Sequence, residues 1–432
     1  YKDNIKNVIK KFVLENTQMN AQVKWDMCKT KIKEYTMKYS KEKHDKKNQT
    51  FKYLQEEYEK ISQETEENTF EENMEKIEEI KMKIDKWLTY KCKGAFVRSR
   101  QRWMECGEKS TKYFLQTEKR NAKKKEIDCL KKNGKCVTNR ETILGEIFNY
   151  YKDLYTQKVD VNIHERENYL ASIEIPALSD NEAMLCEGLI SEEECREAIF
   201  SMKNNKSPGS DGLSTEFYKC FWDDIKLMVI ESINEGFQKQ ELSESQKLAI
   251  LTLLYKKGDK QCLDNWRPIS LLNIDYKILA KVLCKRLKQV IDKLISYDQT
   301  GYLKQRSAMQ NLRLVQDIVE YCEYYDFPGI LLFLDFKKAF DCVDHQFLFH
   351  LLHKFNFKES FIGWIKVIYK NAVGSVINNG WVSQKFEINQ GIRQGCPLSA
   401  LLFILVAEVM TLKIKQNNDI HGITVCLSKT DH

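Results

Sequence analysis

The first 93 residues of this 432-residue chain contain neither proline nor glycine, and the whole chain has only 5 prolines. Nothing therefore interrupts a helix there, and apolar side chains recur at helical spacing on both sides of a polar gap at residues 63–68. The pattern predicts two long helices that fold back on each other as an antiparallel arm. For the acidic part of this region, a solvated helical linker is the simpler interpretation.

Three further absences narrow the class of protein. The 14 cysteines include no C-x-x-C pair, which excludes the usual zinc spacing and predicts unpaired thiols in a reducing compartment. The longest apolar run, Ala400–Ala407, is too short to cross a membrane. No signal peptide is present and the first residue is tyrosine, so we expect an internal segment of a longer protein.

Positive charge is confined to one part of the sequence. The formal net charge is +7, yet residues 91–135 carry 15 basic and 5 acidic side chains, counted from the sequence. Such a block predicts a polyanionic partner such as nucleic acid, although a lysine-rich linker has the same composition. Basic side chains, which bind phosphate, alternate there with aromatic rings, which stack on bases. An amphipathic helix with aromatic residues on its core face would have a similar sequence. The candidate nucleic-acid-binding residues are Arg98, Arg100, Arg102, Lys109, Lys112, Tyr113 and Arg120.

A single carboxylate follows the most apolar stretch between residues 300 and 340. Five apolar residues, Ile330–Leu334, precede Asp335, and Phe336 follows it. Because the run does not alternate, it predicts a strand buried on both faces. Burying an unpaired carboxylate costs several kcal/mol. A divalent cation bound at the end of the strand would offset this cost and explain why an aspartate follows the apolar run. An Asp that only caps the next helix is the alternative.

Basic residues follow another predicted strand, residues 248–255. Lys256 and Lys257 follow this strand, and Arg267 lies between Trp266 and Pro268. A hairpin that placed one of these lysines beside Arg267 would form a clamp for a triphosphate. Two surface cations on a loop would give the same sequence.

Two glycine-containing loops complete the candidate site. Residues 204–212 and 391–399 could expose backbone amides to a phosphate, and the second loop leads into an apolar helix. Ordinary turns explain both loops as well. The other predicted elements are a strand-turn-strand at 127–137, an irregular connection at 156–180, a hairpin turned at Asn379-Gly380, and helices at 140–155, from Ser191, 276–295, 309–325, 361–369 and 398–415.

In this order, the motifs resemble the reverse transcriptase of non-LTR (LINE-type) retrotransposons. The similarity covers nearly the whole chain, and five motifs in the correct order make it specific. The matching segments are Ser207–Gly212, Lys256–Asp259 with Asn265–Ile269, Asp298–Tyr302, Leu334–Asp341 and Gly391–Ser399, with Gly107–Phe114 resembling the segment between endonuclease and polymerase.

The resemblance implies an α+β fold, with the fingers and part of the palm of a reverse transcriptase preceded by a long helical arm. We expect residues 1–125 to form the arm, 126–240 an N-terminal extension and 241–432 the polymerase domain. The implied activity is RNA-directed DNA polymerisation with an RNA template, a DNA primer, dNTPs and two Mg²⁺ ions. It implies no membrane, and assembly with the element's own RNA as a ribonucleoprotein.

Site residues carry over from the resemblance one by one. Asp335 would bind metal with help from the Phe336 carbonyl, and Phe340 would exclude a ribose 2′-OH. Lys256 and Arg267 would grip the triphosphate. Gln394 and Gly395 would line the nucleotide pocket and template.

Two departures from the family pattern affect these expectations. Gln305 stands where a glycine usually precedes Arg306. The paired aspartates should follow residues 420–425, but the sequence reaches His432 without them, so we expect this segment to be incomplete for catalysis. We expect Asp341 and Asp344 to face solvent rather than to replace them. The alternatives are an inactive fragment that binds RNA and primer, and a protein like group II intron maturases.

Overall fold

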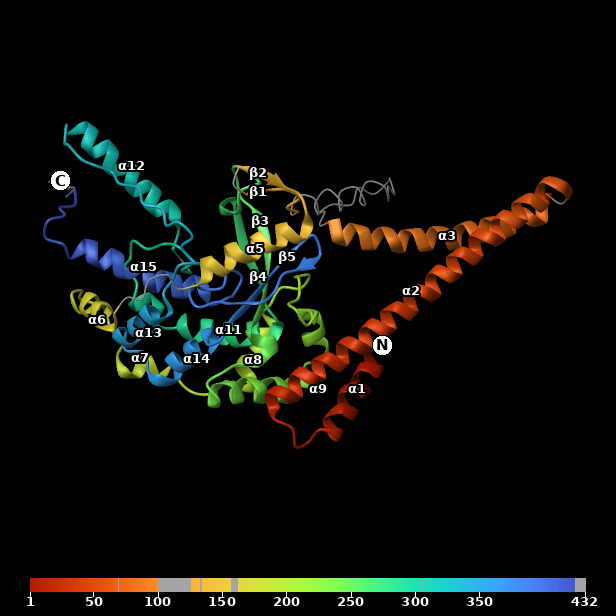
Figure 1. The fold of residues 1–432 in the computed structure, drawn as a ribbon, viewed down its shortest axis with the longest axis horizontal. Coiled ribbons are helices and arrows are strands. Elements are labelled where there is room, and N and C mark those ends of the chain that lie inside the picture. Colours follow the sequence, from red (N-terminus) through yellow and green to blue (C-terminus); the bar gives the residue numbers. More distant parts are fainter. Residues whose placement is uncertain (69, 100–125, 133, 157–161, 305, 424–432) are drawn as a thin grey trace, which may run out of the picture.

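The computed structural model describes residues 1–432 apart from 69, 100–125, 133, 157–161, 305 and 424–432 (Figure 1). Three N-terminal helices, α1 (Lys2–Glu15), α2 (Ala21–Asn68) and α3 (Phe70–Ser99), precede a body of mixed helix and sheet. The α+β prediction is thus confirmed at the level of fold class. Within the described residues, no helix combines the length and apolar character that a membrane crossing requires.

The far ends of α2 and α3 pack against each other as an arm that projects from the body (Figure 1). The rings of Phe51 and Trp87 stack with centroids 3.9 Å apart, and the Lys47 ammonium lies 3.3 Å from the ring centroid of Tyr90. Lys47 contacts Tyr90, and Phe51, which lies later in α2, contacts Trp87, which lies earlier in α3. The two helices are therefore antiparallel. The predicted arm is confirmed, although α2 runs through the polar gap as far as Asn68.

A five-stranded sheet forms the centre of the body. Its order is β4 (Trp266–Leu271), β3 (Leu248–Tyr255), β5 (Val373–Asn378) and β6 (Trp381–Val382), and β7 (Phe386–Glu387) also pairs with β5. Strand β3 has partners on both sides, since it runs antiparallel to β4 and parallel to β5. The turn between β5 and β6 has positive φ at Asn379 and Gly380, as the Asn-Gly pair predicts.

Helices cover this sheet and agree with most of the predicted ranges. The helix α5 (Arg140–Tyr155) and the apolar helix α15 (Ser399–Lys415) match closely, while α11 (Ile274–Leu287) ends earlier than expected. The remaining helices of the body are α6 (Ile163–Ala171), α7 (Asp180–Met184), α8 (Glu192–Phe200), α9 (Thr215–Gln238), α10 (Glu244–Lys247), α12 (Ala308–Tyr324), α13 (His345–Lys354) and α14 (Glu359–Tyr369). The connection expected to be irregular therefore contains α6 and the start of α7.

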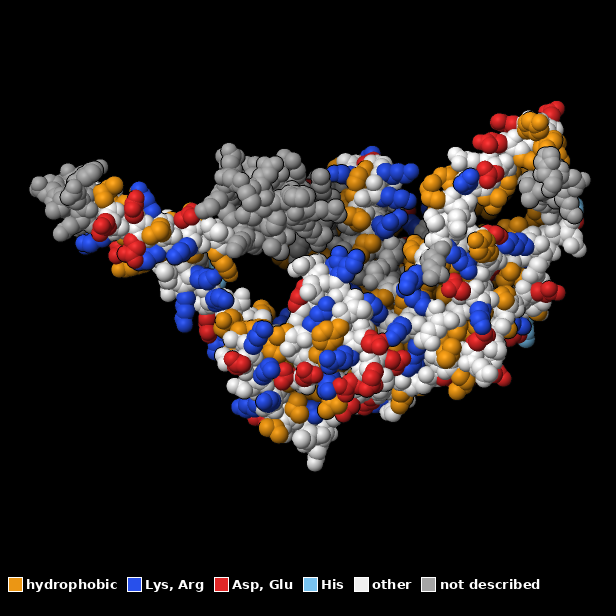
Figure 2. Space-filling model, turned by 180° about the vertical axis from the view of Figure 1, so that it is seen from behind, with side chains coloured by type: hydrophobic (Ala, Val, Ile, Leu, Met, Phe, Trp, Pro, Cys, Tyr) orange, Lys and Arg blue, Asp and Glu red, His pale blue; other side chains and the backbone are white. Residues whose placement is uncertain are grey.

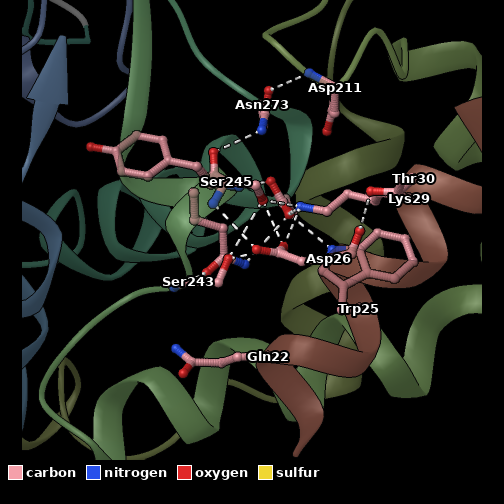
Figure 3. A network of polar contacts seen from close by, with 12 residues as sticks. Gln22, Trp25, Asp26, Lys29, Thr30, Asp211, Ser243, Ser245 and Asn273 are labelled. Carbon is pink, nitrogen blue, oxygen red and sulfur yellow. Dashed lines mark hydrogen bonds and ion pairs between the residues drawn. The ribbon is translucent and has the colours of Figure 1, made fainter. Parts of the chain in front are cut away.

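A buried polar network anchors the base of the arm (Figure 3). Trp25 donates a hydrogen bond from Nε1 to Asp275 Oδ2 over 2.8 Å, and the Lys29 ammonium lies 2.7 Å from the same oxygen and 3.0 Å from Asp26. Burial alone would lower the Lys29 pKa, but the charges of Asp275 and Asp26 raise it to about 12. The cation is therefore retained in the interior, where it joins α2 to the N-terminus of α11.

The network extends to the loop before α9. Asn273 donates to the Ser245 carbonyl over 2.8 Å and accepts from the Asp211 amide over 3.3 Å. A Cβ on Gly209 would lie 2.1 Å from the Asn273 side chain, so only glycine fits there. Close packing thus accounts for the glycine-containing loop at residues 204–212, as the alternative of an ordinary turn proposed.

The apolar run at residues 330–334 is not a buried strand, which makes that prediction wrong. Ile330 is 94% exposed and Leu332 is 74% exposed, and the backbone from 328 to 336 has no regular structure. The preceding helix, α12, also has no buried residue. A strand needs a hydrogen-bonded neighbour on at least one edge, and among the described residues nothing pairs with this run.

Cysteine pairing also differs from the expectation at one place. The strands β1 (Leu130–Lys132) and β2 (Lys135–Val137) form the predicted short hairpin, and a disulfide joins Cys129 to Cys136 across it. These thiols are seven residues apart, and only the antiparallel pairing of the hairpin brings them together. Nine other cysteines of the described residues take part in no disulfide.

Candidate functional site

A cleft of about 660 Å³ lies between the β3–β4 hairpin, α5 and the start of α15. It brings together residues from five parts of the sequence that are far apart. All seven residues that the sequence assigned to metal or nucleotide binding line it, namely Lys256, Arg267, Asp335, Phe336, Phe340, Gln394 and Gly395. Their common location follows from the fold, and their chemical roles stay predictions.

The two predicted triphosphate ligands lie on the β3–β4 hairpin. Arg267 faces Leu254 across the hairpin, and the Lys256 amide donates to the Asn265 carbonyl over 2.9 Å. Both basic side chains are exposed, so they can reach a ligand in the cleft. Of the two lysines that the sequence left open, Lys256 is the one that lines the cleft.

Aromatic rings fix the position of Phe340. Its ring stacks on that of Phe403 from α15 with centroids 5.0 Å apart, and the Tyr302 ring lies edge-on at 6.4 Å. Phe336 makes an edge contact with the same Phe403 ring at 6.0 Å. A bulky side chain is thus held rigidly at one side of the cleft, as discrimination by size requires.

The carboxylate of Asp335 lies in the exposed segment that lines the cleft. Mg²⁺ takes oxygen ligands in octahedral geometry and is commonly held by one or two carboxylates together with substrate phosphates. Asp335 fits the role of one such carboxylate. It lines the same cleft as Lys256 and Arg267, the two exposed cations that are predicted to bind the triphosphate. Among the described residues, no group of three His, Cys, Asp or Glu side chains could hold a metal.

The loop at residues 391–395 is held from two directions. Its amides at Gly391 and Ile392 donate to the carbonyls of Val343 and Phe340, each over 2.7 Å, and the Gln394 carbonyl accepts from the Ser270 amide over 2.7 Å. Gly395 has φ +107°, and a Cβ there would lie 2.8 Å from the Ser270 carbonyl. The Gly391 and Ile392 amides therefore already have protein partners, and the loop connects β4 to the 335–341 segment.

Asp341 is buried at the inner end of the cleft, so the expectation that it faces solvent is wrong. Only 3% of it is exposed. Tyr155 donates to its Oδ1 over 2.8 Å and the Gln394 side-chain amide donates to its Oδ2 over 2.9 Å. Burial raises the pKa of this carboxyl, although both hydrogen bonds oppose the change.

Asp344, by contrast, stays partly exposed. It caps the N-terminus of α13 by accepting from the Phe347 amide over 2.7 Å, and it pairs with Arg166 at 3.0 Å. Neither contact points to metal binding. No sequence pattern distinguishes the two aspartates, because the partners that enclose Asp341, Tyr155 and Gln394, are distant from it in sequence.

A second polar cluster at the cleft was missed by sequence reasoning. The Lys338 ammonium lies 2.7 Å from Asp264 and donates to the Tyr150 hydroxyl over 2.5 Å, and that hydroxyl in turn donates to Asp264 over 2.7 Å. These hydrogen bonds lower the Asp264 pKa. The three residues come from α5, the turn before β4 and the 335–341 segment, and no spacing in the sequence connects them.

The remaining predicted residues are mostly outside the described structure. Arg98 lies in the last turn of α3, and the other candidate nucleic-acid-binding residues lie in 100–125. Gln305 is also outside, while Arg306 donates to the Ser296 and Gln299 carbonyls. On the face shown in Figure 2, basic and acidic side chains are interspersed over the body, without a large patch of one sign.

Comparison with known proteins identifies the family. Residues 255–427 match the family model described as reverse transcriptase (RNA-dependent DNA polymerase). Over 317 residues the chain is 35% identical to the transposon TX1 uncharacterized 149 kDa protein of Xenopus laevis, which covers 73% of the chain and 24% of that protein. It is 26% identical over 221 residues to the Pol polyprotein of the type-2 retrotransposable element R2DM of Drosophila melanogaster, covering 51% and 20%.

A third relative has a more explicit description. The RNA-directed DNA polymerase from mobile element jockey of Drosophila funebris is 25% identical over 235 residues, which is 54% of the chain and 25% of the relative. The chain thus spans about a quarter or less of the length of each of these three curated relatives. The resemblance stated from the motifs is confirmed, and residues 255–427 are a reverse transcriptase domain of the kind found in the proteins of non-LTR retrotransposons.

Proposed function

We propose that this chain supplies the fingers and part of the palm of an RNA-directed DNA polymerase. Its substrates would be an RNA template, a DNA primer and dNTPs, in a ribonucleoprotein with the element's own RNA. One observation carries the proposal: seven residues assigned from separate motifs line a single cleft. Motifs that matched by chance would have no reason to converge.

Each part of the cleft has a proposed task. Lys256 and Arg267 bind the triphosphate, because both are exposed cations on one hairpin. Asp335, with the Phe336 carbonyl, holds Mg²⁺. Phe340, wedged between two rings, occupies the space that a ribose 2′-OH would need. Gln394 and Gly395 form the inner wall of the nucleotide pocket.

Two Mg²⁺ ions, when bound, would lower the pKa of the primer 3′-hydroxyl and neutralise charge on the triphosphate. Three carboxylates line the cleft, but Asp264 and Asp341 are engaged by protein donors, and the described residues contain no cluster of three potential ligands. That observation favours a second candidate function, a segment that binds RNA and primer without polymerising. The retrotransposon relatives favour both candidates over a maturase-like protein.

The division of labour along the chain is also proposed. Residues 1–125 would form the arm, with its basic part on nucleic acid, 126–240 an extension that supports the fingers, and 241–432 the polymerase domain. The base of α2 supports this scheme, because Lys29 ties the arm to α11 of the polymerase region.

Primer extension on an RNA template with Mg²⁺ tests the proposal. Three proteins are compared: residues 1–432, the chain extended through its downstream coding sequence, and that extended chain with Asp335→Ala. We expect activity in the extended chain only, and a loss of at least about 1000-fold on Asp335→Ala, because a metal ligand stabilises charge in the transition state.

Other outcomes have distinct meanings. Activity of residues 1–432 alone would show that other carboxylates complete the metal site. An inactive extended chain that still binds a primer–template duplex would support the second candidate. Loss of both activity and binding would contradict the proposed function.

A further inference from the structure

Asp341 is a buried carboxylate for which the proposed function has no task. Its two oxygens accept hydrogen bonds from neutral donors, and no ion pair involves it within the described residues. The charges of Lys338 and Arg267 also favour the ionised form, but burial outweighs them and the two hydrogen bonds, so the pKa of Asp341 is raised. A buried carboxylate of this kind costs free energy that an apolar side chain would not. Packing alone therefore does not account for an aspartate at this position.

The carboxylate determines which way the Gln394 amide points. An ionised carboxylate can only accept hydrogen bonds, so the NH₂ group of Gln394 must face Asp341, at 2.9 Å. Tyr155 holds the other carboxylate oxygen at 2.8 Å, which prevents the carboxylate from rotating away. The Gln394 Oε1 is consequently turned away from Asp341, and none of the described residues is hydrogen-bonded to it.

The backbone of Gln394 is fixed independently of Asp341. Its carbonyl accepts from the Ser270 amide over 2.7 Å, and Gly395 packs against the Ser270 carbonyl. The loop also keeps its backbone bonds to Phe340 and Val343. Loss of the carboxylate would therefore leave the loop in place and release only the orientation of the amide.

We propose that Asp341 is a positioning residue that holds the Gln394 amide with its oxygen toward the cleft, where it accepts a hydrogen bond from the incoming nucleotide. The inference rests on the proposed function, because Gln394 shares the cleft with the two cations expected to bind the triphosphate. Its contribution is to ground-state binding of the nucleotide. It should affect KM for dNTP and leave kcat nearly unchanged.

Steady-state primer extension by the extended chain tests this inference, with KM for dNTP and kcat measured separately. Asp341→Asn keeps the shape of the side chain but offers both a donor and an acceptor, so the Gln394 amide can face either way. We expect KM to rise by about 5- to 20-fold, the range of one lost or inverted hydrogen bond, with kcat within about twofold.

Tyr155→Phe is the matched control. It removes the other hydrogen bond to the same buried carboxylate, yet leaves the bond from Gln394. The melting temperature should fall by a similar amount in both variants, whereas KM should change by less than about threefold in Tyr155→Phe. A purely structural carboxylate would give equal kinetic effects.

A reciprocal substitution sharpens the test. In Asp341→Asn/Gln394→Glu, the asparagine NH₂ donates to the glutamate and the free glutamate oxygen again faces the cleft, so KM should return to within about threefold of the parent. Equal KM changes in Asp341→Asn and Tyr155→Phe, or a fall in kcat at constant KM, would overturn the inference alone. An inactive parent protein would overturn the proposed function and this inference with it.

Discussion

The strand β3 and the run Ile330–Leu334 have nearly the same character in sequence and opposite fates in the structure. Leu251 in β3 is 1% exposed, whereas Leu332 is 74% exposed. Strand β3 has hydrogen-bonded neighbours on both sides, and the other run has none among the described residues. An apolar run indicates that a segment would be stabilised by burial. Whether it is buried depends on the strands and helices that lie beside it in the fold.

The same difference separates two walls of the cleft. The wall that carries Arg267 is supported from behind, because β4 leads to Asn273 and Asp275 in the buried network and contacts the 391–395 loop. The wall that carries Asp335 belongs to an exposed segment. The substrate contacts predicted for the first wall would therefore be pre-formed, whereas those predicted for the second wall would depend on what covers the exposed segment.

The largest effect should come from breaking the support of the first wall. Lys29→Met would leave Asp275 buried without its cation, which should lower the free energy of unfolding by about 3–5 kcal/mol in urea titrations. Lys31→Met is the control, because Lys31 pairs with Glu34 at the surface and should contribute less than about 0.5 kcal/mol. Similar losses in both variants would contradict a special role for the network.

Truncating one leucine in β3 and one in the run Ile330–Leu334 should reproduce the difference in burial as a difference in stability. Leu251→Ala creates a cavity in the core and should cost about 3 kcal/mol, whereas Leu332→Ala should change stability by less than about 0.5 kcal/mol. The measurement is again the free energy of unfolding in urea. A loss above about 2 kcal/mol for Leu332→Ala would show that the exposed run is packed in solution.

A pH-dependent effect should arise at Asp211, which lies behind the supported wall. Burial and the nearby charge of Asp275 raise its pKa to about 7, above the unfolded value near 4. The folded state thus binds the extra proton, and stability falls as pH rises from about 4 to about 7. Asp211→Asn should remove this fall and gain roughly 1–3 kcal/mol relative to the parent at pH 8.

Melting temperatures of parent and variant at pH 5 and pH 8 provide the measurement. Contributions from other titrating groups are common to both proteins and cancel in the difference. A variant whose advantage is the same at both pH values would show that Asp211 does not titrate in this window.

The smallest effect should come from the contact between the two walls. Lys338→Met removes the ion pair with Asp264, which is partly exposed, and should cost less than about 1 kcal/mol in urea. Raising the salt concentration should weaken the parent and leave the variant unaffected. A loss above about 2 kcal/mol would mean that the exposed segment depends on this contact for its position.

Local signals predicted much of the fold, because they depend on neighbours in sequence. The capping box at Ser191 and the turn at Asn379-Gly380 both appear where expected. Strand β3 was also predicted with its observed bounds. What failed depended on tertiary partners: the exposed run at 330–334, the disulfide at Cys129 and the direction of Asp341.

The candidate site divides in the same way. Motif order predicted that Lys256, Arg267 and Gln394 belong together, and they share one cleft. The supporting residues were not predicted, because Tyr155 reaches Asp341 across 186 positions of sequence. The motifs contain the residues that would touch substrate, so they can be found in the sequence. The residues that orient them are distant in sequence, so they can be identified only in the folded chain.

Because helix α2 is unbroken, it sets the length of the arm and couples motion at the base of the arm to motion at its tip. Its 48 residues run from the buried network to the tip, and about 40 of them lie beyond Lys29, which at 1.5 Å per residue is a reach of roughly 60 Å. A rotation of about 5° at that pivot would displace the tip by roughly 5 Å, by simple geometry from the same rise per residue. Small rearrangements behind the β3–β4 hairpin would thus be magnified at the tip of the arm, and a force applied to the tip would act on the sheet through the helix.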